Sequence, residues 1–271
     1  MRLAVLFVVP AILAGLERLA APRAELADPV WQRHDPASEM VVDQGPWADF
    51  LAQHLTVRDG GANRLDYAGV TPGDRAALST HVDRLEAVEV TALSRPAQLA
   101  YWINLYNAAT VELVLAHYPL DSIRDIGSGL LEDGPWSREV VTVMGLELTL
   151  DDIEHGIIRP VFEEPRIHYA VNCAALGCPD LAPEPWDAAT LEADLAAAER
   201  AFVNDRRGVR LEDGELVLSK IWLWFRGDFA DSEAELLSRL REVATGPAAE
   251  ALAGRDRADR HAYDWALNDL R

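Results

Sequence analysis

The chain has 271 residues, and its 45 acidic against 25 basic side chains give a formal net charge of −20 at pH 7. This balance argues against nucleic acids and anionic membrane surfaces as partners, because both require a basic face on the protein. Hydrophobic content of 49% and charged content of 26% are ordinary for a soluble globular protein, and the length suffices for one large domain or two small ones.

The N-terminus resembles a targeting segment. Met1 and Arg2 precede an apolar run, Leu3–Leu16, that is interrupted only by Pro10 and Gly15. Such a run is short for a membrane span but fits the apolar region of a signal peptide. We expect residues 1–24 to be a signal peptide or an N-terminal anchor, with no stable membrane insertion after cleavage. The expected location is periplasmic or secreted.

Residues 25–45 are polar and contain prolines, which predicts a linker ahead of one domain over residues 46–271. Helices are expected at Pro46–Leu55, from Thr71 to about Val90, and from a Ser94 cap to about His117. The last of these is apolar nearly all round, which is typical of a buried central helix. Asn104 and Asn107 share one of its faces and are expected either to brace a neighbouring loop or to touch a ligand.

The sequence Glu139–Leu148 alternates about a Met-Gly turn and predicts a β-hairpin. Thr149 and Asp152 then form a capping-box-like start to a helix that is expected to end at Arg159-Pro160. Glu154 and His155 are adjacent in it. At about 100° per residue they are predicted to be poor hydrogen-bond partners for each other.

Both cysteines of the chain lie in Arg166–Pro179, where apolar and polar residues alternate before a turn. This pattern predicts a strand that ends near Cys173. A thiol at such a strand end can lie near backbone N–H groups, which favour the thiolate. In a regular strand His168 and Cys173 would point to opposite faces, so His168 is not automatically the partner of Cys173.

The C-terminal third predicts further helices and a second hairpin about Asp213-Gly214. The helices are expected at residues 187–203, 220–225, 233–244 and 248–253. The whole pattern favours an α+β fold: a helix-rich single domain with a small antiparallel sheet.

Several blocks resemble the DUF547 family, namely Tyr101–Ala108, Leu150–Pro160, His168–Pro179, Ser219–Phe229 and Tyr263–Asn268. The resemblance covers roughly residues 45–270. It implies a papain-like or transglutaminase-like fold with a Glu–His–Cys site. Carried over to this chain, Cys173 would be the nucleophile, Glu154 the carboxylate, and His155 or His168 the base. Papain-like enzymes usually run Cys before His, so the order Glu, His, Cys would require a permuted topology.

The resemblance suggests a cysteine-dependent hydrolase or acyl transferase that acts on a small molecule or peptide: an amide, a peptide or a γ-glutamyl thiol compound such as glutathione. The candidate substrate-binding residues are Asn104, Asn107, Asn172 and Arg159. Two alternatives stay open: a thiol–disulfide redox protein that uses Cys173 and Cys178, and a non-catalytic binding or scaffold domain in which these cysteines form a structural disulfide. The histidines and cysteines match no standard zinc spacing, so neither a metal nor a cofactor is expected.

Overall fold

The computed structural model describes residues 21–127 and 134–271, which form two compact units. Among these residues, the larger unit comprises Ala24–Ala198 and Asp264–Arg271, and the smaller comprises Glu199–Tyr263 with residues 21–23. The predicted signal peptide lies outside the described residues except for its last four. The two units are described separately below.

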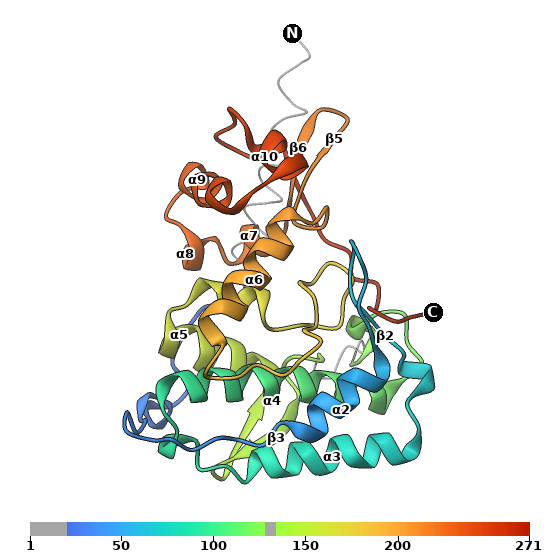
Figure 1. Cartoon of the computed structure of the whole chain (residues 1–271), viewed down its shortest axis with the longest axis vertical. Helices are drawn as coiled ribbons and strands as arrows, with labels where there is room; N and C mark the ends of the chain where they lie inside the picture. The colour runs from blue at the N-terminus through green and yellow to red at the C-terminus, as the bar shows by residue number, and fades with distance from the viewer. Residues whose placement is uncertain (1–20, 128–133) are drawn as a thin grey trace. The chain divides into compact units, whose positions relative to one another are not determined.

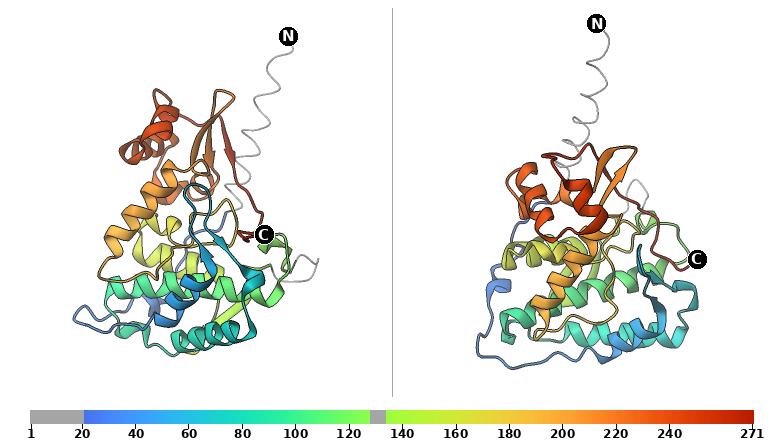
Figure 2. Two further views of the ribbon diagram at one scale, coloured as in Figure 1. Left: turned by 45° about the vertical axis from the view of Figure 1, so that its right-hand side comes forward. Right: turned by 45° about the horizontal axis from the view of Figure 1, so that its top comes forward.

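Three helices form the body of the larger unit: α2 (Gly45–His54), α3 (Pro72–Glu86) and α4 (Arg95–His117). Helices α3 and α4 lie side by side in the views of Figures 1 and 2. Thr71 caps α3 with a reciprocal capping box to Asp74, which is the geometry that fixes a helix start. Nearly all side chains of α4 from Gln98 to Leu115 are buried, so the prediction of a central buried helix is confirmed.

The larger unit also contains two short antiparallel ladders. Strand β1 (Leu55–Thr56) pairs with β2 (Arg64–Leu65), and β3 (Glu139–Val143) pairs with β4 (Leu146–Thr149). Met144 and Gly145 both have positive φ at the second turn, as a two-residue hairpin loop requires. This confirms the predicted hairpin. Short 3-10 helices are η1 (Pro29–Gln32), η2 (Tyr67–Gly69), η3 (Val90–Ala92), η4 (Ile123–Asp125) and η6 (Pro165–Tyr169).

Part of the predicted linker packs into the core of the larger unit. The side chain of Trp31 in η1 is 2% exposed, and its ring meets that of Trp102 on α4 edge-on at 5.2 Å between centroids. Such edge-to-face pairs stabilise beyond the area they bury. Residues near 31 are therefore held by the same core as α4.

The smaller unit contains the end of α6 (Leu191–Asn204) and a three-stranded sheet. Strands β5 (Val209–Glu212) and β6 (Glu215–Ser219) form the predicted hairpin, and β7 (Arg260–Ala262) adds to β6 in the parallel direction. Helices α7 (Ile221–Trp224), α8 (Arg226–Phe229), α9 (Glu233–Val243) and α10 (Gly246–Leu252) complete the unit. The α+β class is therefore confirmed, with sheets that are small and antiparallel apart from the β6–β7 pair.

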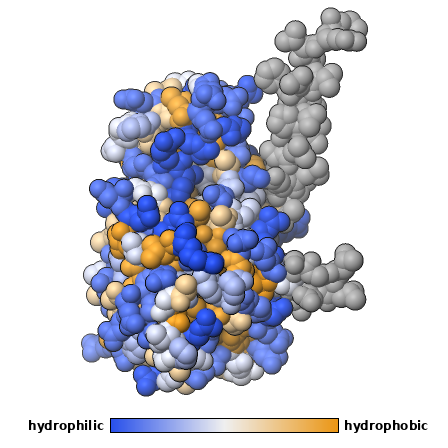
Figure 3. Space-filling view, turned by 90° about the vertical axis from the view of Figure 1, so that its right-hand side faces the viewer, coloured by the Kyte–Doolittle hydropathy of each residue, from blue (hydrophilic) through white to orange (hydrophobic). Residues whose placement is uncertain are grey.

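Apolar side chains also reach the surface, as the space-filling view of one face shows in Figure 3. The large exposed ones among the described residues are Met40, Val41, Val57, Leu146, Leu211 and Leu270. Most of them come from separate elements, and scattered exposure of this kind is normal.

Candidate functional site

The predicted helix after β4 is a π-helix, η5 (Asp152–Ile158), followed by α5 (Arg159–Phe162). Its start follows the sequence, since Thr149 and Asp152 exchange the predicted capping hydrogen bonds. The expected end at Arg159-Pro160 is wrong, because the helix continues to Phe162. π-helical segments are rare and frequently mark functional sites.

Proline cannot donate the hydrogen bond that a helix requires at position 160, and the segment before η1 supplies backbone N–H groups to two carbonyls of the preceding turn. The N–H of Glu25 donates to the carbonyl of His155 at 3.1 Å, and the N–H of Ala27 donates to that of Gly156 at 2.9 Å. A Cβ on Gly156 would come within 2.8 Å of the Ala27 side chain. Glycine at this position therefore permits the close approach of the two segments.

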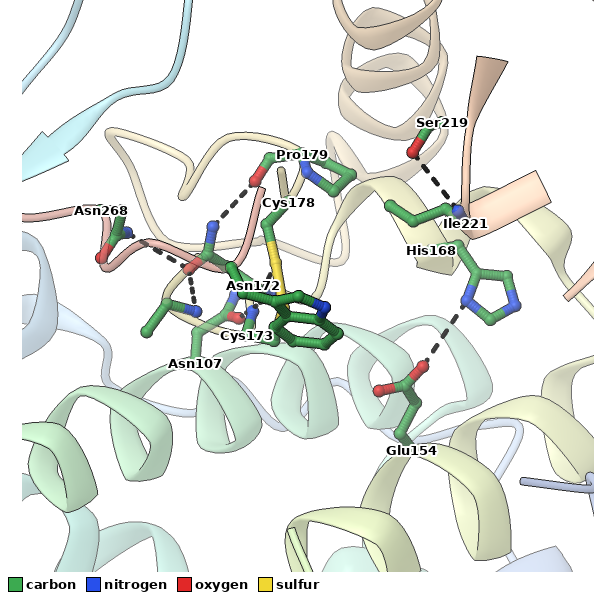
Figure 4. Close-up of a disulfide and its surroundings, with 12 residues drawn as sticks. Asn107, Glu154, His168, Asn172, Cys173, Cys178, Pro179, Ser219, Ile221 and Asn268 are labelled. Atoms are coloured by element: carbon green, nitrogen blue, oxygen red, sulfur yellow. Dashed lines mark hydrogen bonds and ion pairs between the residues drawn. A yellow bond between two sulfur atoms is a disulfide. The ribbon is translucent and has the colours of Figure 1, made fainter. Parts of the chain in front are cut away.

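The π-helix brings Glu154 to two histidines, and all three side chains are buried. Figure 4 shows Glu154 facing the imidazole of His168, with 3.6 Å between Oε1 and Nδ1. The Nδ1 of His155 lies 3.8 Å from the same oxygen. A π-helix has more residues per turn than an α-helix, so adjacent side chains diverge by less than the predicted 100°. The 3.8 Å between the two side chains is still long for a hydrogen bond.

The carboxyl group of Glu154 is held in its charged form. Burial alone would raise its pKa, but the neighbouring His155, the contact with His168 and the charge of Arg159 outweigh burial and lower the pKa to about 2. A buried carboxylate beside Nδ1 of a histidine fixes the ring's orientation and favours protonation at that nitrogen. Nε2 is then the His168 nitrogen that would exchange a proton with a substrate or nucleophile.

His155 has different neighbours. A guanidinium nitrogen of Arg159 donates to its Nδ1 at 3.1 Å, and its Nε2 lies 3.6 Å from the carboxylate of Asp151. Burial and the negative charges of Glu154 and Asp152 raise the pKa of Asp151 to about 6. Arg159, a candidate for substrate binding, is itself buried and engaged with His155. His155 is thus held between Arg159 and Asp151, so it is better placed to support its neighbours than to transfer a proton.

The cysteine segment differs from the predicted strand. Residues 165–169 form the 3-10 helix η6, and irregular backbone follows through Cys178, with an isolated antiparallel bridge between Ala175 and Leu267. The strand prediction is wrong because the alternating residues are buried on both sides: Ile167, His168, Tyr169, Ala170, Val171 and Asn172 are all buried. The argument that strand parity separates His168 from Cys173 therefore no longer applies.

Cys173 and Cys178 form a disulfide with their Cα atoms 6.3 Å apart, within the usual range for a bridge. The backbone N–H of Cys173 also donates to the sulfur of Cys178 at 3.0 Å. The next residue, Ala174, has φ of 57°, an uncommon value outside glycine that often marks functional sites. In Figure 4 the disulfide and the Glu154–His168 pair are separate clusters in the same view.

The candidate asparagines brace backbone. Asn107 donates to the carbonyl of Ala170 at 3.0 Å and accepts from the N–H of Asn172 at 2.8 Å. Asn104 makes the same two bonds to the backbone of Trp186. Asn172 accepts from the N–H of Ala174 at 2.9 Å and donates to the carbonyl of Pro179 at 2.8 Å. These amides hold the loops on either side of the cysteines.

Sequence reasoning missed that the C-terminal segment 264–271 supports the cysteine loop. The N–H groups of Leu176 and Gly177 donate to the carbonyls of Ala266 and Asp264, both at 2.8 Å, and Asn268 donates to the carbonyl of Ala174 at 3.0 Å. The Asn268 side chain accepts from the hydroxyl of Tyr67 at 2.9 Å. The Tyr263–Asn268 block was visible in the sequence, but its place in the fold was not.

A cavity of about 370 Å³ lies in the larger unit beside α4. Asn104, Tyr101 and Trp186 line it, together with the exposed pair Met40 and Val41. Of the candidate site residues, Asn104 is the one that lines this cavity. Its amide is already committed to Trp186, so in this structure it shapes the wall of the cavity.

Within residues 21–127 and 134–271, no cluster of three or more His, Cys, Asp or Glu side chains has the arrangement of a metal site. Nor does that part of the chain contain a helix with the length and apolarity to cross a membrane.

Comparison with known proteins gives one match. A family model described as "Protein of unknown function, DUF547" matches residues 90–203, which include α4, η5 and both cysteines. No curated protein and no solved structure matches the chain. The likeness to papain-like enzymes stays a prediction.

Proposed function

We propose that the chain, whose residues 90–203 match the DUF547 family model, is a cysteine-dependent hydrolase or acyl transferase with Cys173, His168 and Glu154 as its reactive groups. The observation that carries the proposal is the buried Glu154–His168 pair, 3.6 Å apart on two unusual helices in the matched region. A buried carboxylate that orients a histidine is the acid–base half of a nucleophilic site.

His168 is favoured over His155 as the base. Glu154 faces the Nδ1 of His168, so Nε2 would take the proton from the Cys173 thiol. The Nδ1 of His155 accepts a hydrogen bond from Arg159, and its Nε2 faces Asp151. His155 and Arg159 would then hold Glu154 in its ionised state rather than take part in proton transfer.

In the proposed reaction, the Cys173 thiolate attacks the acyl carbon of an amide, peptide or γ-glutamyl substrate. The protonated Nε2 of His168 donates its proton to the leaving amine as the carbon–nitrogen bond breaks, which leaves a thioester on Cys173. Water or an acceptor amine then attacks this thioester and regenerates the thiol. The Cys173–Cys178 bond must first be reduced by a thiol, because a sulfur in a disulfide is not a nucleophile.

The disulfide favours a second candidate, a protein whose two cysteines act in thiol–disulfide exchange or only stabilise a scaffold. It also supports the proposal that the chain is exported to a periplasm or the outside, where such bonds persist. The two functions differ in their use of Cys178. Acyl transfer requires Cys173 and tolerates Cys178→Ala, whereas redox cycling is lost equally with either cysteine.

The proposal is tested without a known substrate by measuring the iodoacetamide reactivity of reduced Cys173 between pH 5 and 9. We use the Cys178→Ala background and compare it with added His168→Asn or Glu154→Gln. We expect an apparent pKa for Cys173 below the ordinary value of about 8.5, which rises toward it in both variants. His117→Asn is the matched control, because His117 is exposed at the end of α4.

If the iodoacetamide reactivity of Cys173 has the same pH profile in all four proteins, the assignment of His168 and Glu154 is wrong. If the profiles shift as expected, a panel of amide and thioester substrates identifies the acyl group. Activity in that panel should vanish with Cys173→Ala and persist with Cys178→Ala. Equal loss with both changes would favour the redox candidate.

A further inference from the structure

We infer that Cys173 is a site of S-thiolation: a small monothiol opens the disulfide at the sulfur of Cys173, and Cys178 leaves as the thiolate. The two cysteine residues differ in exposure. Cys178 is 2% exposed, whereas Cys173 is only partly buried. An attacking thiolate must approach along the line of the two sulfurs from the far side of the one it attacks, so access decides which sulfur reacts.

The leaving group is prepared by the backbone. The N–H of Cys173 donates to the sulfur of Cys178 at 3.0 Å. A hydrogen bond to the charged form of a group lowers its pKa, and a thiol of lower pKa leaves faster. This N–H is directed at the sulfur of Cys178, so it favours the departure of Cys178 as the thiolate.

The loop would keep its shape after the bond opens, because its other supports do not involve sulfur. The N–H of Cys178 donates to the carbonyl of Ala175 at 3.1 Å, and Asn172 donates to the carbonyl of Pro179. The C-terminal segment holds Leu176 and Gly177 through two further backbone bonds. Cys178 would thus remain close to Cys173, within reach for reclosure.

In the exchange, a thiolate R–S⁻ forms a new bond to the sulfur of Cys173, the Cys173–Cys178 bond breaks, and its electron pair remains on Cys178. The product is a mixed disulfide on Cys173 and a thiolate on Cys178. The Cys178 thiolate can reverse the step and expel R–S⁻. Alternatively, a second R–S⁻ attacks the mixed disulfide, releases R–S–S–R and leaves both cysteines reduced. The inference concerns sulfur exchange alone and does not require the proposed acyl transfer.

The test uses the full chain purified without reductant and incubated briefly with 2-mercaptoethanol at pH 8. Acid stops the exchange, the liberated thiol is alkylated with N-ethylmaleimide, and peptide fragmentation between the two cysteines locates each group. We expect the mercaptoethanol adduct on Cys173 and maleimide on Cys178, in at least about tenfold excess over the reverse assignment. An equal mixture, or the adduct mainly on Cys178, would overturn the inference.

Single-cysteine variants provide a second measurement. With hydroxyethyl disulfide, the lone Cys173 of Cys178→Ser should react at least about tenfold faster than the lone Cys178 of Cys173→Ser, because the latter sulfur is buried. In urea the two rates should converge. If a variant does not fold, its rate already matches the urea value, and the trapping experiment on the unaltered chain decides. The trapping experiment needs no acyl substrate, so a failure of this inference can be distinguished from a failure of the proposed function.

Discussion

Replacing Asn107 with alanine tests whether the amides of α4 hold the cysteine segment. The substitution removes the acceptor of the Asn172 N–H and the donor to the Ala170 carbonyl, and these partners lie in buried segments. Each buried polar group left without a partner costs about 1–3 kcal/mol. The free energy of unfolding should therefore fall by about 2–6 kcal/mol, measured by urea denaturation with circular dichroism.

Asn204→Ala is the matched control. Asn204 is exposed, yet its amide makes the same kind of contact: it donates to the carbonyl of Val243 at 3.0 Å and accepts from the N–H of Thr245 at 2.6 Å. Water can replace it, so the cost should be about 1 kcal/mol or less. Hydrogen exchange should become faster at the amide of Asn172 with Asn107→Ala alone. A loss no larger than that of the control, with unchanged exchange at Asn172, would refute the reasoning.

Two further predictions concern the same unit. Because burial and nearby negative charges raise the pKa of Asp151 to about 6, its ionisation destabilises the fold as pH rises through that value. Asp151→Asn should raise the free energy of unfolding by about 1 kcal/mol at pH 7.5. This value is reduced for solvent screening because the Asp151 side chain is 38% exposed, and the gain should disappear by about pH 4. The exposed control Glu147→Gln should show no such trend in urea melts, and a gain that is independent of pH would contradict the argument. Leu267→Ala should lower the free energy of unfolding by about 2–5 kcal/mol, and Leu270→Ala by about 0.5 kcal/mol, because Leu267 is 5% exposed and Leu270 is 42% exposed. Equal losses would show that segment 264–271 does not support the fold.

Local signals explain which parts of the fold could be predicted. A Thr-Pro start, a Met-Gly turn and an Asp-Gly turn each act through a few neighbouring residues, and the structure has the expected helix or hairpin at all three. The 23-residue α4 was predictable for a related reason. A long helix that is apolar on every side must be buried by other parts of the protein.

The cysteine segment could not be predicted because its alternation has no local cause. Ile167, Tyr169 and Val171 are buried by tertiary packing, and so are the residues between them, so the period of two carries no information about faces. The supports of the loop are remote in sequence, since Asn107 and Asn268 come from opposite sides of it along the chain. Neither residue lies near Cys173 in the sequence, so a local pattern around Cys173 cannot reveal them.

The choice between the two histidines shows the same limit more sharply. In an ideal α-helix, Glu154 and His155 diverge, and a regular strand after residue 166 gives His168 no defined relation to Glu154. The structure replaces the first with a π-helix and the second with a 3-10 helix. Neither helix follows from propensity: the π-helix is accommodated by the backbone N–H groups of Glu25 and Ala27, which donate to carbonyls one turn before Pro160. The geometry that favours His168 therefore depends on a segment whose sequence alone predicts only a linker.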